Sequence, residues 1–187
     1  MTETLSGMAM GALRELSDVF GRMPDDCADE LIDAIIAARR IVLFGCGREG
    51  LQMRGFAMRL FHLGRDATVW GDMSMPALGG RDLLVVSAGP GDLATVRVLV
   101  CRAREAGART ALITAQPKAP LAEQVDVVTV IPAQTMADDS VANASILPMG
   151  SLFEAAQMVF FELVVLKLRP LLHETVETMR ARHTNLE

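Results

Sequence analysis

The segment Ile41-Val-Leu-Phe-Gly-Cys-Gly-Arg-Glu-Gly50 decides the fold. Its first four residues form a short, continuous apolar run that starts with β-branched side chains and stops at Gly45, a pattern typical of a strand buried on both faces. The glycine-rich turn that follows leads into residues with helical spacing, and this helix is expected to end near Gly64. A buried strand that passes through a tight turn into a helix is the beginning of a βαβ unit.

The same alternation of strands and helices continues along the chain. Apolar runs predict four more strands, at residues 67–70, 82–86, 110–113 and 125–131. Helices are expected over residues 8–20 and 93–105, from a start at Pro24, Asp25 and Asp26, and from Ser151 toward the C-terminus. Strands that alternate with helices imply right-handed crossovers. We therefore predict an α/β fold, a three-layer sandwich in which helices flank a mostly parallel five-stranded sheet of the flavodoxin-like, doubly wound kind.

The length of 187 residues is typical of one domain with a sizeable core. We expect a single domain over residues 1–187, with N-terminal helices at 1–39, an α/β core at 40–147, and a C-terminal helix and tail at 148–187. No internal repeat, low-complexity tract or linker interrupts the sequence.

The composition excludes several classes of partner. A net charge of −5 without a basic run predicts no nucleic-acid partner. The most apolar stretch, residues 145–168, contains Glu154, Glu162 and Lys167, so we expect a buried or interfacial helix there rather than a membrane span. The 12 Met residues in a chain that is 51% hydrophobic favour burial shared between subunits of a homo-oligomer.

The cysteines are Cys27, Cys46 and Cys101, which lie far apart and form no Cys-x-x-Cys pair. Neither a disulfide framework nor a zinc cluster is therefore supported, and we expect no metal. The N-terminal sequence Met1-Thr-Glu-Thr-Leu lacks the basic start and the apolar run of a secretory signal. We expect a reduced, cytoplasmic setting.

Two predicted strand ends are rich in glycine and pass directly into helices, at residues 45–50 and 87–92. Ligands bind at the carboxyl ends of strands in folds of this class, and two such turns offer backbone N–H groups to one ligand, typically a phosphate. Residues 45–50 also match Gly-x-Gly-x-x-Gly, so a dinucleotide site is an alternative, with Asp72 as its acid. A third interpretation is that the glycines only permit tight turns.

Further motifs extend along nearly the whole chain. The first half contains Gly45-x-Gly-Arg48, Arg54-Gly-Phe-Ala-Met-Arg-Leu-x-His62-Leu-Gly64 and Gly71-Asp-x-x-x-Pro76-Ala77. The second half contains Pro148-Met-Gly-Ser-Leu-Phe-Glu154 and the closing Arg182-His183-x-Asn185-Leu-Glu187. In this order and spacing the chain resembles the SIS (sugar isomerase) domain family, and its 6-phospho-3-hexuloisomerases in particular.

The resemblance implies an isomerase that interconverts a 3-hexulose 6-phosphate and fructose 6-phosphate. A base removes the proton next to the carbonyl, an enediolate forms, and the proton returns to the neighbouring carbon, chemistry for which no cofactor is expected. The match to the family's Gly-x-Leu-Phe-Glu motif makes Glu154 the candidate base. By the same resemblance His62 and His183 are auxiliary donors, in sites shared between the subunits of a homotetramer.

Each of these residues also has a purely structural interpretation. Ser151-x-x-Glu154 is a capping box, in which the glutamate bonds back to the N-cap N–H. His62 stands at a predicted helix end, where it would cap the last carbonyls. The polar tail around His183 would fray by default.

The two ligand-binding turns depart from the family pattern. The first normally reads Gly-x-Gly-Arg-Ser, and here Glu49 replaces the serine. The second normally reads Ser-x-Ser-Gly-x-Thr, and here Ser87 is kept while Gly89, Pro90 and Asp92 replace the second serine, the glycine and the threonine. In the family those hydroxyls hold the substrate phosphate. Carboxylates repel a phosphate dianion, and proline has no N–H to donate.

These substitutions leave the end group of the small-molecule ligand open. Glu49 and Asp92 are either acceptors for an unphosphorylated or amino sugar, or solvated turn residues with Asp92 as the N-cap of the next helix. Arg48 is expected to pair with one of these acids or with ligand. A non-catalytic, sugar-binding SIS module is the alternative function. The predicted substrate-binding residues are Gly45, Gly47, Arg48, Glu49, Ser87, Gly89, Gly91 and Asp92.

Overall fold

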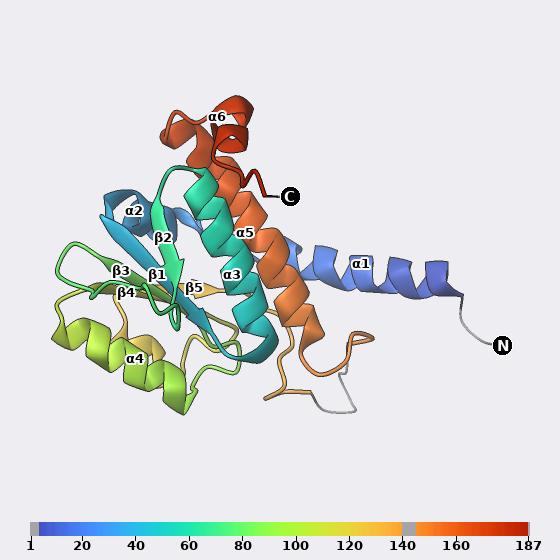
Figure 1. Ribbon diagram of the computed structural model, residues 1–187. Helices are drawn as coiled ribbons and strands as arrows, with labels where there is room; N and C mark the ends of the chain where they lie inside the picture. The colour runs from blue at the N-terminus through green and yellow to red at the C-terminus, as the bar shows by residue number, and fades with distance from the viewer. Residues whose placement is uncertain (1–3, 140–144, 187) are drawn as a thin grey trace.

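Five parallel strands form one sheet in the computed structural model, which describes residues 4–139 and 145–186. The strands are β1 (Arg40–Gly45), β2 (Asp66–Val69), β3 (Leu83–Ser87), β4 (Arg109–Thr114) and β5 (Val127–Val130). Their order in the sheet is β2-β1-β3-β4-β5, the order of flavodoxin-like doubly wound folds (Figure 1). The predicted α/β sandwich is confirmed, with every strand pair parallel.

Helices cover both faces of this sheet. They are α2 (Asp29–Ala37), α3 (Gly47–His62), α4 (Ala94–Glu105) and α5 (Ser151–Leu171). Successive side chains of a strand point to opposite faces. Ile41 and Leu43 accordingly belong to one core with α2, α3 and α5, whereas Val42 belongs to a second core with α4. This division explains why the strand at 40–45 reads as continuously apolar.

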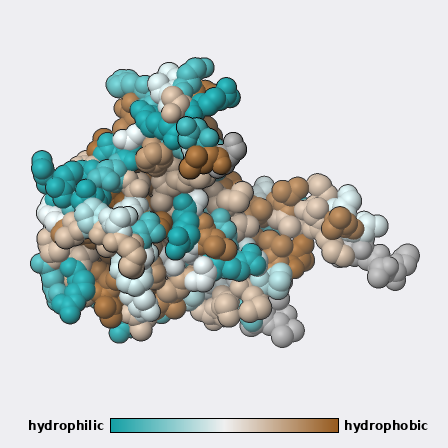
Figure 2. Space-filling model, viewed as in Figure 1, coloured by the Kyte–Doolittle hydropathy of each residue, from teal (hydrophilic) through white to brown (hydrophobic). Residues whose placement is uncertain are grey.

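The first helix, α1 (Leu5–Gly21), projects from the body of the molecule (Figure 1). Thr4 caps it by accepting a hydrogen bond from the Gly7 N–H at 3.1 Å. Its C-terminal part packs near α5 and buries Val19 completely. The outer part leaves Leu5, Met8, Met10 and Leu13 between 46% and 83% exposed, and Figure 2 shows apolar atoms on this projecting arm. An amphipathic helix with an uncovered apolar face is typical of a contact surface.

Several element boundaries differ from the sequence prediction. The second helix starts at Asp29, because Cys27 and Asp29 donate their N–H groups three residues back, to Pro24 and Asp26, and so form tight turns before the helix. The last strand spans Val127–Val130 rather than residues 125–131. Two short helices were not predicted, η1 (Ala122–Gln124) and α6 (Val176–Ala181).

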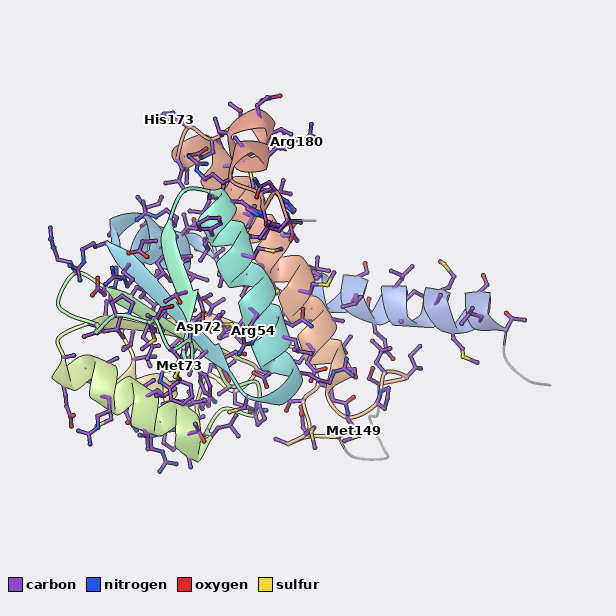
Figure 3. All side chains as sticks on the ribbon, viewed as in Figure 1. Arg54, Asp72, Met73, Met149, His173 and Arg180 are labelled. Atoms are coloured by element: carbon purple, nitrogen blue, oxygen red, sulfur yellow. The ribbon has the colours of Figure 1, made fainter. Side chains whose placement is uncertain are left out.

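The helices α3 and α5 lie side by side and run in the same direction. Arg48 pairs with Glu154 near their N-terminal ends, and Arg59 pairs with Glu162 farther along. Figure 3 shows Met149 at the first end, and His173 with Arg180 at the other. The rise of an α-helix places residues 48 and 62 about 21 Å apart. No helix in residues 4–139 or 145–186 is long and apolar enough to cross a membrane.

Candidate functional site

The ends of β1 and β3 bring the two glycine-rich turns together. Gly45 and Ser87 are register partners in adjacent strands, so the turns that follow them leave the sheet side by side. A Cβ atom added to Gly50 would lie 2.5 Å from the carbonyl oxygen of Gly45, and Gly47 has a φ of 55°. These glycines let α3 start directly against the carboxyl edge of the sheet.

A cavity of about 240 Å³ lies beside these turns. The start of α3, the turn after β3, the segment after β5 and the start of α5 line it. Among the described residues, its charged lining side chains are Arg48, Glu49 and Glu154. The cavity therefore stands where folds of this class bind ligands, and it is lined by one cation and two carboxylates.

Glu154 enters this cavity from the first turn of α5. Gly150, with a φ of 77°, precedes the helix, and a Cβ atom there would lie 2.9 Å from the Met136 nitrogen. Glu154 Oε2 lies 2.6 Å from Arg48 Nε; the glutamate side chain is 12% exposed and that of the arginine 65%. Burial raises the pKa of Glu154, while the charge of Arg48 opposes this rise. A half-enclosed carboxylate of this kind is suited to proton transfer.

The capping-box interpretation of Ser151-x-x-Glu154 is wrong. The N-cap of α5 is Gly150, and no side-chain hydrogen bond caps this helix. Glu154 points to Arg48 instead, because α3 brings a guanidinium to the start of α5 and a charged partner binds a carboxylate better than a backbone N–H does. Arg48 was expected to pair with one of the acids of the ligand turns or with ligand, and in the structure it pairs with Glu154.

Glu49 is buried and accepts hydrogen bonds from two neutral donors. Its residue is 9% exposed, which excludes the interpretation as a solvated turn residue. The Ser87 hydroxyl donates to Glu49 Oε2, and the Gly89 N–H lies 3.1 and 3.0 Å from its two carboxylate oxygens. Burial raises the pKa of Glu49, and the donors Ser87 and Gly89 act in the opposite direction. The charge of Glu154 raises this pKa further, so the two carboxylates interact.

Gln157 completes this network and was not singled out in the sequence. It is completely buried in α5, and its Nε2 donates to the Ser87 hydroxyl oxygen at 2.7 Å and lies 3.7 Å from Met53 Sδ. Since Gln157 donates to Ser87, the single proton of the serine hydroxyl is directed at Glu49. The available signal was one amide three residues after Glu154, in an otherwise apolar helix face.

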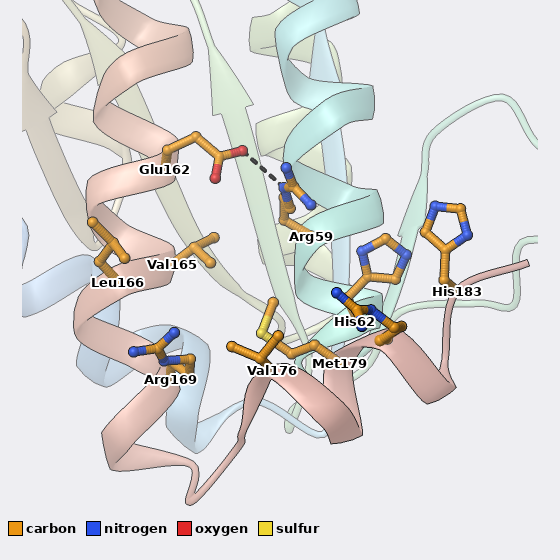
Figure 4. A pocket seen from close by; sticks show the side chains of 10 residues that line it. Arg59, His62, Glu162, Val165, Leu166, Arg169, Val176, Met179 and His183 are labelled. Carbon is orange, nitrogen blue, oxygen red and sulfur yellow. Dashed lines mark hydrogen bonds and ion pairs between the residues drawn. The ribbon is translucent and has the colours of Figure 1, made fainter.

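His62 and His183 lie at the opposite end of α3, away from this cavity. Their rings stack with centroids 5.2 Å apart. They line a groove of about 530 Å³ together with Arg59, Glu162 and other side chains of α5 and α6 (Figure 4). One chain thus does not bring His62 and Glu154 into one site, since about 21 Å of helix separates the ends.

The C-terminal end of α3 is closed by its backbone. The C-cap is Leu63, whose N–H bonds to carbonyls of α3, and the carbonyl of His62 accepts from Arg182 Nη1 at 2.9 Å. The histidine residue itself is 5% exposed, because the tail that carries His183 folds back onto it. In that tail Asn185 is exposed and Glu187 lies outside the described residues.

The chain is related to proteins of named activity, although no family model matches it. It is 32% identical over 175 residues to the 3-hexulose-6-phosphate isomerase of Bacillus subtilis (strain 168), an alignment that covers 94% of this chain and 95% of that protein. The chain belongs to the 3-hexulose-6-phosphate isomerase family. The 3-hexulose-6-phosphate isomerase of Mycobacterium gastri is 36% identical over 173 residues, 92% of this chain and 86% of that protein.

A solved structure supports the same assignment. It is a Methanococcus jannaschii protein whose structure infers a molecular function of 3-hexulose-6-phosphate isomerase. That protein is 28% identical, aligns with a TM-score of 0.79 and covers 98% of both chains. The predicted resemblance to SIS-domain phosphosugar isomerases is confirmed.

Two of the predicted binding residues in this 3-hexulose-6-phosphate isomerase family member, Asp92 and Gly91, are engaged in contacts within the chain. Asp92 bonds to Arg97, with one contact of 3.2 Å between Asp92 Oδ1 and Arg97 Nε. The N-cap of α4 is Leu93, so the predicted N-cap at Asp92 is wrong. Gly91 has a φ of 96°, and a Cβ atom there would lie 2.6 Å from Gln116 Cβ. This glycine is required by packing of the turn.

Asp72, the acid of the dinucleotide alternative, accepts a hydrogen bond from Thr68 Oγ1 at 3.4 Å on the exposed side of the turn after β2. Within residues 4–139 and 145–186 no group of three or more His, Cys, Asp or Glu side chains is placed to hold a metal ion.

Proposed function

We propose that this protein is a sugar isomerase of the 3-hexulose-6-phosphate isomerase type, with Glu154 as its proton-transfer base. The observation that carries the proposal is the Glu154 carboxylate in the cavity at the carboxyl edge of the sheet, half-enclosed and 2.6 Å from Arg48. The named activity of relatives that align over most of the chain supports the same reaction.

The reaction moves a carbonyl by one carbon. Starting from the 2-ketose, ionised Glu154 removes the proton on C3, and the electrons of the C–H bond form an enediolate across C2 and C3. The oxygen on C2 then gains a proton while the hydroxyl on C3 loses one, and the protonated carboxyl returns its own proton to C2, which leaves a hydroxyl at C2 and the carbonyl at C3. Every proton and electron pair is retained, so a base and donors for the developing oxyanion are sufficient.

Arg48 has two tasks in this scheme. In the resting site its guanidinium favours the ionised form of Glu154, because the positive charge opposes the effect of burial on the pKa. Its side chain is 65% exposed, so it is free to swing toward ligand. We assign it to the oxygen that becomes negative in the enediolate, where a preorganised cation lowers the barrier. The cavity's glycine-rich turns orient the sugar.

The two histidines are assigned to the site of a neighbouring subunit in a homo-oligomer, a tetramer by resemblance. His62 and His183 lie in a groove about 21 Å along α3 from Glu154, so they need a partner chain to meet a substrate. The uncovered apolar face of α1, with Leu5, Met10 and Leu13 exposed, supports such an assembly.

A cytoplasmic location belongs to the same proposal. Its support is the state of the three cysteines, which are all free. Unpaired thiols persist in reducing compartments.

Proton exchange in D₂O tests the reaction directly. Fructose and fructose 6-phosphate are each incubated with the protein, and loss of the C3–H signal is followed by proton NMR. Isomerisation through an enediolate replaces this hydrogen by deuterium in at least one of the two sugars. The Glu105→Gln variant, altered on the far end of α4, is the control. If wild-type protein exchanges no carbon-bound proton of either sugar, the proposed function is wrong.

A further inference from the structure

The turn after β3 has no hydrogen-bond donor left for a ligand between residues 88 and 91. The N–H of Ala88 bonds to the Ile113 carbonyl at 3.0 Å, and that of Gly91 bonds to the Ala88 carbonyl at 2.8 Å. The Gly89 N–H and the Ser87 hydroxyl both donate to Glu49, while residue 90 is proline and has no N–H. The donors that face the cavity from this turn are therefore occupied by an internal carboxylate.

The space around Gly89 is also filled by Glu49 and Phe153. A Cβ atom on Gly89 would lie 3.0 Å from Glu49 Oε1 and 2.8 Å from the ring of Phe153. A serine side chain at position 89 thus has no room while Glu49 is in place. The glutamate at position 49 and the glycine at position 89 form a matched pair, in which a carboxylate fills the volume that a side chain at 89 would need.

The charges that line the cavity also oppose the binding of a phosphate. Its single lining cation, among the described residues, is Arg48, and that guanidinium is paired with Glu154. Glu49 has neutral donors as its hydrogen-bond partners, Ser87 and Gly89. A phosphate dianion at this turn would meet an uncompensated carboxylate and would find no free donor, and both effects oppose its binding.

We infer that Glu49 makes the site selective for a sugar that carries a hydrogen-bond donor, a hydroxyl or an ammonium, where a phosphosugar carries its phosphate. This inference rests on the proposed isomerase function and changes only the end group of the substrate. A carboxylate has about four acceptor positions, and the two neutral donors leave capacity on the side that faces the cavity. A hydrogen-bond donor on the ligand would occupy the remaining acceptor position of Glu49. The buried hydrogen bonds among Glu49, Ser87 and Gln157 hold the carboxylate in one orientation for it.

Binding of sugars that differ at C6 alone tests the inference. Calorimetric titration compares fructose with fructose 6-phosphate, and glucose with glucose 6-phosphate and 6-amino-6-deoxyglucose. We expect each unphosphorylated sugar to bind at least about tenfold more tightly than its phosphate ester. The aminosugar then separates the two donors, because tighter binding than glucose indicates an ammonium. Tighter binding of either phosphate ester by the wild-type chain overturns the inference.

The Glu49→Ser variant tests the residue itself. It frees the Gly89 N–H and the Ser87 hydroxyl and removes the negative charge, so fructose 6-phosphate should gain about tenfold or more in affinity while fructose loses affinity. Glu105→Gln removes an exposed carboxylate elsewhere and should leave both affinities unchanged. An unaltered preference in a folded Glu49→Ser protein contradicts the inference, and the wild-type comparison decides it if this variant does not fold.

The inference and the proposed function fail in different ways. If the wild-type chain exchanges the C3 proton of fructose 6-phosphate faster than that of fructose, and Glu154→Gln abolishes this exchange, the isomerase function stands and the selectivity of Glu49 is wrong. If sugars bind with the expected preference but no proton exchanges, the selectivity stands and the isomerase function is wrong.

Discussion

The two ends of the α3–α5 pair are held in similar ways but carry different chemistry. At the N-terminal end, Arg48 pairs with a glutamate side chain that is 12% exposed beside the 240 Å³ cavity. At the other end, Arg59 pairs with Glu162, which is 48% exposed in the groove of His62. Both pairs join the same two helices, and at the cavity end burial raises the pKa of Glu154, which agrees with its proposed role as base.

An ion pair can hold a glutamate in position without making it reactive. An ion pair between neighbouring helices is a structural device at either end, and exposed pairs contribute little to stability. What distinguishes the cavity end is the buried second carboxylate, Glu49, and the helix starts that surround it. Among the described residues, the groove at the histidine end has donors but no buried carboxylate. The proposed site shared with a neighbouring chain would bring the two sets of groups together.

Glu154→Gln should produce the largest effect, because it removes the proposed base at the cavity end of the α3–α5 pair. Removing the base is expected to lower the rate of C3 proton exchange by about 10²–10⁴-fold, the usual contribution of general base catalysis. Glu162→Gln removes the matching ion pair and is expected to lower the rate by less than about threefold, since such a pair is worth about 0–1 kcal/mol. Equal losses in the two variants would show that the α3–α5 pairing, rather than the base, controls activity.

His62→Ala tests whether the two ends meet in an assembly. Loss of a donor to the developing oxyanion should lower the exchange rate by about 100-fold. Mixed with Glu154→Gln, dissociated and reassembled, the two inactive variants should regain about a quarter of wild-type activity, because random pairing in a symmetric oligomer leaves that share of sites intact. If the mixture is no more active than the sum of its separate components, the site is not shared between chains.

Sequence reasoning located the strands well because their signal is local. The strands at 40–45 and 83–87 are continuous apolar runs, and the central residues of both are buried as such runs require. Helix starts were less accurate. The turns before Asp29 depend on hydrogen bonds three residues back, and neither Pro24 nor the acids after it distinguishes such a turn from a helical first turn.

The candidate site was predictable where its chemistry is local and not where it depends on distant contacts. Glu154 was singled out by its match to the family's Gly-x-Leu-Phe-Glu motif, and Glu49 by its departure from the family's first turn. Gln157 was missed because its partner, Ser87, lies 70 residues away in sequence. The separation of His62 from Glu154 follows from helix length, about 21 Å over 14 residues, but which helix lies beside α3, and in which direction, is a matter of tertiary packing.

The dependence of stability on pH tests the burial of Glu49. An unfolded glutamate titrates near pH 4.5, and burial raises the pKa of Glu49 in the folded chain. Between these two values the folded chain binds more protons than the unfolded chain does. Stability from this group is therefore present below the unfolded pKa and is lost as the pH rises through the folded pKa.

Glu49→Gln should remove this dependence. Urea unfolding of both proteins at several pH values from about 4 to 8 measures it. The free energy of unfolding of the wild-type chain, minus that of the variant, should decrease as the pH rises. A difference that does not change with pH would mean that Glu49 is not buried as the hydrogen bonds from Ser87 and Gly89 require.

The smallest expected effect concerns two strained residues, one at each end. Met149 before α5 and His173 after it both have a φ of 55°, a conformation that costs a residue with a Cβ atom about 1–2 kcal/mol. Both residues are exposed, so Met149→Gly and His173→Gly lose little packing. Each should raise the free energy of unfolding by about 0.5–1 kcal/mol after the entropic cost of glycine.

Met149 also lines the cavity, so Met149→Gly should alter sugar binding whereas His173→Gly should not. Identical effects of the two variants on binding would indicate that the backbone before α5 has no part in holding the ligand.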